Sequence, residues 1–428
     1  MLRKLSVSDI LFPALGKSSF LIDLYRAKSI KKLAFSRESD MLSGMNRTPS
    51  VNPPFGLKPN EVRQLASFTF DDNAYSGLPG SGGEGGIKFI LDLFNENKNH
   101  DGSPIVGTFF LKADNITDND TEENRYVKEI WHRAQVEGNE IAMHTYSHPH
   151  GLEFDWDADP VTRTPIMDLN DWMAEHEKWY KTMEKPYAPE KEDSGLGIRK
   201  EDIVGFRTPF LEYNDNLFTS LDKLGILYEA AVEEGWQEDK NGTNEFWPYT
   251  MDNGSPGETF VSEAFYAQKP MISSHPGLWA LPMYVFTTPP DEICEKYGTR
   301  PGLRARLAAD NPDFDVNSGK ITGMDWNLWF EYFMDENDAF ATMAYTFDLH
   351  YEGNRCPFYV GMHTDIYCDK YDKNDLEGEE ITKIKANAAQ RRNMVRRMLA
   401  HILSKKDVQI LTAKDTIRYL NDPELLKI

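Results

Sequence analysis

Cysteine is scarce in this sequence, and cationic residues are few relative to acids. Three cysteines occur among 428 residues (Cys294, Cys356 and Cys368), so at most one intrachain disulfide can form and a disulfide-stabilised scaffold is excluded. Lys and Arg number 47 against 69 acids, which gives a formal net charge of −22. Nucleic-acid binding depends on cationic side chains that neutralise phosphates, so this balance argues against nucleic acid as a partner.

Long apolar runs and repeats are also lacking. No apolar stretch approaches the roughly 20 residues that a membrane-spanning helix needs. The first 40 residues carry eight Lys or Arg against four acids. Their one apolar run, from Ile10 to Gly16, is interrupted by Pro13 and stopped by Lys17, which matches a signal peptide poorly. The sequence thus predicts no transmembrane segment and shows no recognisable leader.

Short apolar runs alternate with helical stretches from about Gln64 onward. We predict buried strands at 66–70, 105–111, 140–144, 203–206, 226–231 and 407–411. Helical spacing favours helices at 122–136, 170–183, 215–224 and 382–403, with a short helix from 413. This rhythm predicts an α/β fold with a mostly parallel sheet. Polar residues follow several strands, which suits a site at the strands' carboxyl ends.

The chain divides into a short arm and one large domain. Residues 1–60 are interpreted as an N-terminal arm or linker, because 41–60 are rich in turn formers. Residues 61–425 are predicted to form the large domain. Two stretches in it, at about 237–259 and 289–322, have the composition of insertions.

Two carboxylates end the first predicted strand, at Asp71 and Asp72. Neighbouring residues in a strand point to opposite faces. At the strand's end the backbone turns, so both carboxylates can face one pocket in different roles. A solvated turn is the alternative interpretation.

Two histidines follow the strand at 140–144, at His144 and His148. Two imidazoles four residues apart on one helical turn can bind one metal ion, and a carboxylate can complete the set. The alternative is a capping or hydrogen-bonded surface role.

Three further residues stand at the ends of apolar segments. Arg207 follows the strand at 203–206 and either holds a carboxylate through a bidentate pair or lies on the surface. Trp279 lies between turns and either walls an apolar pocket or packs in the core. His363 closes an apolar run and is either a general acid near neutral pH or a structural residue.

In this order, the five segments resemble the motifs of the polysaccharide deacetylase (NodB-homology) family, carbohydrate esterase family four, over most of residues 64–422. The first motif implies Asp71 as the catalytic base and Asp72 as a metal ligand. The second implies His144 and His148 as the other ligands of one divalent ion, expected to be zinc, with cobalt or nickel as alternatives. Family membership also implies a distorted (β/α) barrel of seven to eight strands with loop insertions.

The later motifs imply the remaining roles. Arg207 would orient the base, and the backbone N–H of Phe210 would face the oxyanion. Trp279 would shape the pocket for the acetyl methyl group. His363 would be the general acid.

Within the family the resemblance is strongest to the insect-like chitin deacetylases and their bacterial relatives. Residues 202–211 and 347–358, the latter leading on to His363, carry this likeness. The sequence departs from the pattern at three positions. Asn73 replaces a small residue, Phe210 replaces the commoner Tyr, and Ala280 stands where relatives carry an acid, which leaves open what pairs with Arg207 besides Asp71.

The resemblance implies metal-dependent hydrolysis of N-acetyl groups from a GlcNAc-containing polysaccharide, chitin or chitooligosaccharides above all. Such an enzyme is a hydrolase acting on linear amide C–N bonds. It would have no nucleic-acid or protein partner, and its polymeric substrate implies an extracellular or periplasmic location. The alternatives are a peptidoglycan N-acetylglucosamine deacetylase, a catalytically silent carbohydrate-binding protein on the same fold, and a glycosidase that uses paired carboxylates.

Overall fold

Strand β1 (Gln64–Asp71) organises the sheet in the computed structural model, which describes residues 46–117, 121–155, 162–376 and 379–428. All eight residues of β1 are buried. One edge of β1 pairs in parallel with β14 (Phe358–His363). Its other edge pairs in parallel with β15 (Val408–Ile410) at the start and with β2 (Thr108–Leu111) at the end. Because β1 has paired strands on both edges, even its polar residues Gln64, Ser67 and Thr69 are buried.

The main sheet contains nine strands and follows the order β14-β1-β2-β3-β6-β7-β10-β9, with β15 added to β1. Its pairs are parallel except for the last, β10 with β9. The remaining bounds are β3 Glu140–Met143, β6 Gly205–Phe206, β7 Tyr228–Glu229, β9 Tyr249–Thr250 and β10 Trp279–Ala280. The eight strands of this path form a curled sheet, which confirms the predicted α/β barrel-type fold.

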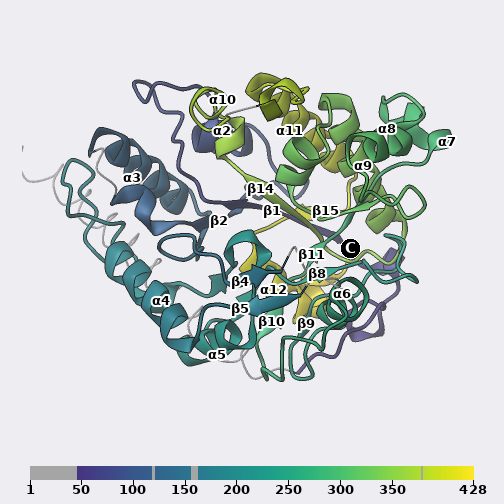
Figure 1. Ribbon diagram of the computed structural model, residues 1–428, viewed down its shortest axis with the longest axis horizontal. Helices are drawn as coiled ribbons and strands as arrows, with labels where there is room; N and C mark the ends of the chain where they lie inside the picture. The colour runs from purple at the N-terminus through teal and green to yellow at the C-terminus, as the bar shows by residue number, and fades with distance from the viewer. Residues whose placement is uncertain (1–45, 118–120, 156–161, 377–378) are drawn as a thin grey trace, which may run out of the picture. The chain divides into compact units, whose positions relative to one another are not determined.

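Helices cover the outside of the curled sheet (Figure 1). Helices α3, α4 and α5 surround one side, and α2, α9 and α11 surround another. Their bounds are α2 Gly86–Asn95, α3 Thr121–Val136, α4 Leu169–Met183, α5 Asp215–Leu224, α9 Glu336–Glu352 and α11 Ala388–Leu403. The other α-helices are α6 Pro256–Tyr266, α7 Asp291–Cys294, α8 Leu303–Asp310, α10 Tyr371–Asn374, α12 Ala413–Leu420 and α13 Pro423–Leu426.

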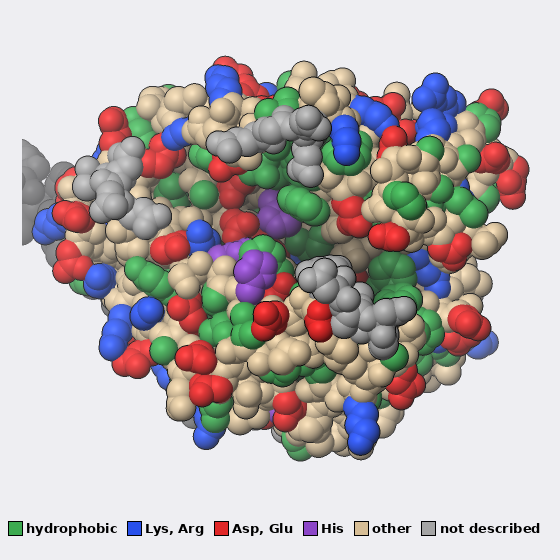
Figure 2. All heavy atoms as spheres, viewed as in Figure 1, with side chains coloured by type: hydrophobic (Ala, Val, Ile, Leu, Met, Phe, Trp, Pro, Cys, Tyr) green, Lys and Arg blue, Asp and Glu red, His purple; other side chains and the backbone are tan. Residues whose placement is uncertain are grey.

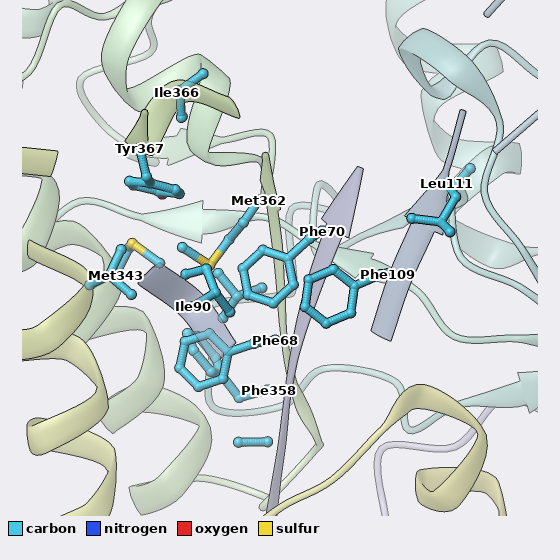
Figure 3. Close-up of a cluster of buried hydrophobic side chains, with 14 of the residues drawn as sticks. Phe68, Phe70, Ile90, Phe109, Leu111, Met343, Phe358, Met362, Ile366 and Tyr367 are labelled. Carbon is cyan, nitrogen blue, oxygen red and sulfur yellow. The ribbon is translucent and has the colours of Figure 1, made fainter. Parts of the chain in front are cut away.

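Aromatic side chains fill the core between β1 and the helices that cover it (Figure 3). Phe70 of β1 stacks on Phe109 of β2 with ring centroids 5.0 Å apart. Phe68 and Phe70 both contact Phe94 of α2, at 5.8 and 6.2 Å. This packing fixes the position of β1, and with it the position of the two acids at its carboxyl end.

The segments outside the main sheet form smaller units. Three two-stranded pairs join β4 (Leu152–Phe154) to β5 (Arg163–Pro165), β8 (Glu233–Glu234) to β11 (Met283–Tyr284), and β12 (Phe286–Thr287) to β13 (Lys320–Ile321). The predicted insertion at 237–259 contains β9 and the start of α6. The one at 289–322 contains α7, α8 and β13.

The described part of the predicted arm packs against the large domain. Ser50 forms a β-bridge with Trp247, and the Arg47 guanidinium lies 5.6 Å from the ring of Trp279. Residues 46–428 form one compact unit. Residues 1–45 lie outside the described residues. The three cysteines are buried and unbridged, and the described helices include none with the length and apolar character to span a membrane.

Candidate metal and acid–base site

The carboxyl ends of β1, β3 and β14 open into a cleft of about 540 Å³. The chain turns sharply after β1 and β3, because Asp72, Asn73, Thr145 and His148 all have positive φ angles, between 57° and 67°. The turn after β1 lets the adjacent Asp71 and Asp72 both line the cleft. His144 and His148 therefore lie in a turn, which corrects the expectation that they share one helical turn.

Asn73 secures the turn that follows β1. Its side-chain amide donates to the carbonyls of Phe70 and Phe110, at 2.9 and 3.0 Å, and its amide oxygen accepts from the Thr364 hydroxyl at 3.0 Å. These bonds tie the end of β1 to β2 and to the segment after β14. The departure from a small residue at this position thus has a structural explanation.

Asp72, His144 and His148 form the one group among the described residues whose ligand atoms could hold a metal ion. Oδ1 of Asp72 lies 3.7 Å from Nε2 of His144 and 3.4 Å from Nε2 of His148. The three ligand atoms lie within 4.8 Å of one another. Two imidazole nitrogens and one carboxylate oxygen suit zinc, cobalt or nickel, so the donor set fits the implied divalent ion.

The hydrogen bond of His144 and the burial of His148 suit metal binding. Nδ1 of His144 lies 2.9 Å from the backbone carbonyl of Arg207 and donates to it, which leaves Nε2 facing Asp72. Burial lowers the pKa of His148 to about 4, despite the opposing charge of Asp72, so this imidazole is neutral near pH 7.

Arg207 holds Asp71 in a buried ion pair. Its Nη1 donates to Oδ1 of Asp71 at 2.8 Å, and both side chains are at most 3% exposed. Its other donors reach the Thr69 hydroxyl at 2.9 Å and the Ala230 carbonyl at 2.8 Å. Arg207 is therefore satisfied without an acid at position 280. Ala280 pairs in the sheet with Glu229, an acid whose pKa burial raises to about 8 against the opposing charge of Arg207.

His363 lies directly beside Asp71, because the two are register partners on β1 and β14. Nδ1 of His363 lies 2.8 Å from Oδ1 of Asp325, and the backbone N–H of His363 donates to the other carboxylate oxygen at 3.0 Å. Burial opposes protonation of this imidazole, but the hydrogen bond and charge of Asp325 outweigh it and raise the pKa of His363 to about 9. His363 is therefore protonated at neutral pH.

A glycine allows Asp325 to reach this histidine. The backbone N–H of Gly361 donates to the carbonyl of Gly323 at 3.3 Å, which brings residues 323–325 against β14. A Cβ atom at Gly361 would lie 2.1 Å from the sulfur of Met324. A larger residue at this position would therefore displace the side chain of Met324, the neighbour of Asp325. Asp325 is completely buried and also accepts from the Tyr367 hydroxyl at 2.7 Å.

Trp279 does not reach the cleft, which corrects the expectation that it shapes an acetyl pocket. It lies in β10 with none of its surface exposed, and the described residues that line the cleft do not include it. Trp326 lines the cleft instead and is 44% exposed. The sequence analysis did not identify Asp325 or Trp326 as site residues. An acid next to a tryptophan, shortly after the predicted insertion at 289–322, is the sequence feature that could have indicated them.

Phe210 lies on the rim of the cleft, with a φ angle of 55°. Its ring is half exposed, stacks on His150 with centroids 4.0 Å apart and meets His148 edge-on at 4.4 Å. Glu212 accepts from Nδ1 of His150 at 3.0 Å. The left-handed backbone at Phe210 costs roughly 1 kcal/mol for a residue other than glycine. Such strain is typical of functional loops.

Two further histidines lie away from this site. His275 is held between Asp222 and Asp215, at 2.7 and 2.9 Å. His350 is buried beside the Cys356 carbonyl. Both have structural partners, and the described residues that line the cleft include neither.

Residues 58–228 match the family model described as polysaccharide deacetylase. Chitin deacetylase 8 of Bombyx mori is 23% identical over 323 residues, covering 74% of this chain and 64% of that protein. Chitin deacetylase 1 of the same species is 24% identical over 312 residues, covering 72% of this chain and 45% of that protein. The chain thus spans less than two thirds of the length of either curated relative.

A solved structure from Mycobacterium smegmatis, described as a polysaccharide deacetylase, is 16% identical with a TM-score of 0.45. The match covers 88% of this chain and 95% of the Mycobacterium smegmatis chain, and this level of similarity says nothing about substrate. The family model and the curated relatives agree with the motif resemblance. Residues 58–228 are therefore similar in sequence to the polysaccharide deacetylase family.

Proposed function

We propose that this protein is a metal-dependent deacetylase that hydrolyses N-acetyl groups from a GlcNAc-containing polysaccharide, with chitin or chitooligosaccharides as its substrate. Two curated relatives are chitin deacetylases, which supports this substrate. We also propose that it acts outside the cytoplasm, where such polymers occur.

The observation that best supports the reaction is the pairing of Asp71 with His363 across β1 and β14. Amide hydrolysis needs one group that accepts a proton from water and another that donates a proton to the departing amine. Each residue has a partner that suits its role, since Arg207 is bound to Asp71 and Asp325 to His363. Both proton-handling residues border the Asp72, His144 and His148 triad in one cleft.

In the proposed reaction Asp71 accepts the proton of the attacking water, and Arg207 keeps its carboxylate in place. His363 then protonates the departing nitrogen, because an amine anion is a poor leaving group. Nδ1 of His363 is bound to Asp325, so Nε2 is the ring nitrogen that delivers this proton. A divalent ion held by Asp72, His144 and His148 would supply polarisation of the acetyl carbonyl and a more acidic attacking water.

A glycosidase is a weaker proposal for the same cleft. Glycosidases position two carboxylates on either side of the glycosidic bond. Asp72, however, lies within 3.7 Å of two imidazole nitrogens that can share a metal with it. A role as metal ligand leaves Asp72 unable to serve as the second glycosidic acid or base.

The test is acetate release from chitooligosaccharides and chitin by metal-stripped protein, with and without added zinc. We expect zinc to restore acetate release without producing new reducing ends. Asp71→Asn protein with zinc bound provides the matched inactive control.

New reducing ends that persist in the presence of a chelator would instead support a glycosidase. Zinc-bound protein that releases no acetate from chitin substrates would contradict the chitin proposal, and peptidoglycan would be tested next. Binding to glycans without acetate release from any of them would support a carbohydrate-binding protein.

A further inference from the structure

The cleft extends past the acid–base residues to a second group of polar side chains that the proposed reaction leaves unused. This second end is lined by Glu233 of β8, Arg163 of β5 and Tyr266 of α6, with Thr322 and Trp326 nearby in the same lining. Figure 2 shows the hollow at the centre of one face, with histidine side chains at its edge and acidic side chains around it. The sequence motifs gave no indication of this end of the cleft.

The charge of Arg163 is already matched by protein groups. Its Nη2 lies 3.3 Å from Oε1 of Glu258, a fully buried acid, and also contacts the Ser262 hydroxyl. Its guanidinium lies 4.4 Å from the centre of the Tyr266 ring. Its Nε has no hydrogen-bond partner but is buried. Arg163 thus stiffens the wall of the cleft and offers no free charge to an anionic ligand.

Glu233, in contrast, faces the cleft with neutral hydrogen-bond partners. Its Oε1 accepts from the indole N–H of Trp236 at 3.1 Å, and Thr322 forms a second hydrogen bond with the carboxylate. The charge of Arg163 acts on Glu233, but the ion pairs of the described residues do not include it. Burial raises the pKa of Glu233. A cationic group beside it would favour the charged form and would gain a hydrogen-bond acceptor at the same time.

Acids outnumber cations in the lining. Among the described residues that line the cleft, five are acids (Asp71, Asp72, Glu212, Glu233 and Asp365), and the cations are Arg163 and the protonated His363. A metal ion bound to Asp72 would offset charge at the reaction centre and not at the Glu233 end. Glycans with carboxylates would therefore meet repulsion there, whereas amine-bearing sugars would meet attraction. The rings of Tyr266 and Trp326 offer apolar faces to the sugar units.

We propose that Glu233 is a specificity-determining residue that binds the free amine of a glucosamine unit near the acetylated unit undergoing hydrolysis. This inference rests on the proposed deacetylase function and names its substrate class more narrowly. The favoured substrate is a partially deacetylated GlcNAc polymer, so one reaction product becomes a recognition element for the next. Polymers that contain free muramic carboxylates are disfavoured.

The test measures binding of three oligosaccharides of equal length to zinc-loaded Asp71→Asn protein, so that binding is read without turnover. One oligosaccharide is fully acetylated, one contains a single glucosamine, and one contains N-acetylmuramic acid with a free carboxylate. We expect the glucosamine oligomer to bind best and the carboxylate oligomer worst. Glu233→Gln should reduce the preference for the amine roughly tenfold, the size of one charged hydrogen bond.

Glu238→Gln is the matched control, because Glu238 is exposed in the neighbouring loop and its substitution removes the same charge. We expect this control to keep the order of binding. The wild-type amine preference should also shrink at high ionic strength, a measurement that needs no variant. Melting temperatures identify any folding defect in Glu233→Gln. In that case Glu233→Asp, which retains the charge, should keep the wild-type order.

Glu233→Gln protein that keeps the amine preference would overturn the inference, and so would a preference for the carboxylate oligomer in the wild type. Acetate release by the wild type is measured separately. If binding depends on Glu233 but no acetate is released, the deacetylase proposal fails and the recognition role stands. If acetate is released without any dependence of selectivity on Glu233, the recognition role fails and the deacetylase proposal stands.

Discussion

Arg207 joins the two halves of the site through different atoms. Its guanidinium holds Asp71, and its backbone carbonyl accepts the Nδ1 proton of His144. The proposed base and a proposed metal ligand are thus fixed by one residue that is almost completely buried. A side-chain substitution here would move the base and leave a buried carboxylate unpaired.

Asp71→Asn should lower kcat by at least about a hundredfold, because the amide cannot accept a proton from water. Zinc should still bind, since the ligand set of Asp72, His144 and His148 is intact. Steady-state kinetics and metal analysis of the purified protein measure the two effects. Asp92→Asn, which removes a surface carboxylate, should leave kcat unchanged. Normal turnover in Asp71→Asn would show that the base is another residue.

Asp325→Asn should move the alkaline limb of the pH–rate profile to lower pH. Asp325 raises the pKa of His363 to about 9, so the wild-type rate should fall as the pH rises through about 9 and the general acid loses its proton. Without the carboxylate charge, the fall should begin nearer the ordinary imidazole pKa of about 6.5. The profile of kcat against pH for both proteins measures the shift.

Tyr367→Phe serves as the control for this profile. It removes one hydrogen bond to Asp325 but leaves the carboxylate beside His363. Its alkaline limb should stay close to that of the wild type. An Asp325→Asn profile that scales down uniformly, without a shift of the limb, would indicate a purely structural role for Asp325.

The site residues that could be predicted from the sequence are those that form an unusual local pattern of residue types. Adjacent acids at a strand end and a His-x3-His pair are unusual, and the structure gathers Asp71, Asp72, His144 and His148 in one cleft. Tryptophan carries no such signal, because it serves core and pocket alike. Trp279 is buried and Trp326 is 44% exposed, a difference that only the fold reveals.

At the scale of single elements, helix α5 is held at both ends by one histidine. Nε2 of His275 contacts Asp215 in the first turn of the helix, and Nδ1 contacts Asp222 in the last. Both ring nitrogens face carboxylates, so the pair is fully hydrogen-bonded only when the imidazole is protonated. Burial lowers the pKa of His275, but the two acids outweigh that effect and raise it above the ordinary value.

His275→Gln should destabilise the protein more at low pH than at high pH. A raised pKa in the folded state means that the stabilisation is complete below the ordinary histidine pKa and is lost as pH rises through the folded value. The loss should be about 1 kcal/mol near pH 6, since both acids are partly exposed and screened. Denaturant unfolding at pH values below and above the histidine pKa measures this loss of stability. His100→Gln is the control. An equal loss of stability at all pH values in His275→Gln would contradict the role of a protonated His275 in holding both ends of α5.

The predicted elements were accurate where one face of the element is polar. Helices α3, α4 and α5 agree closely with the expected 122–136, 170–183 and 215–224. Helix α9 was not predicted, because it is buried on most of its faces and lacks a clear polar stripe. Helix α2 was also missed, since it follows a glycine-rich stretch that resembles a continuing loop. The strands β6 and β7 are two residues long, so their bounds depend on pairing partners that a single sequence does not reveal.

At the scale of the whole molecule, the candidate metal ligands join the ends of β1 and β3, which lie on either side of β2. An ion bound there links segments more than 70 residues apart in the chain. The unfolded chain lacks this arrangement, so metal binding should stabilise the folded state by mass action.

Zinc at about a hundred times its Kd should raise the melting temperature by several degrees, as binding at that concentration stabilises the folded state by about 2.7 kcal/mol. His148→Ala protein should show little or no increase. His150→Ala is the matched control, because His150 lies in the same turn but outside the ligand group, and it should respond like the wild type. Differential scanning calorimetry of chelator-treated protein measures the shift. An increase retained in His148→Ala would place the stabilising ion elsewhere.

The parallel ladder between β1 and β14 has a consequence for how such an enzyme can change. Asp71 and His363 are the last pair of a continuous register that begins at Ala66 and Phe358. The separation of their backbones is therefore set by the spacing of two buried strands, about 4.8 Å, and does not depend on the loops of the cleft. The walls contributed by β4, β5 and α6 belong to separate segments. Mutations in those walls can therefore change which sugar polymer binds, while the backbone spacing of Asp71 and His363 stays the same.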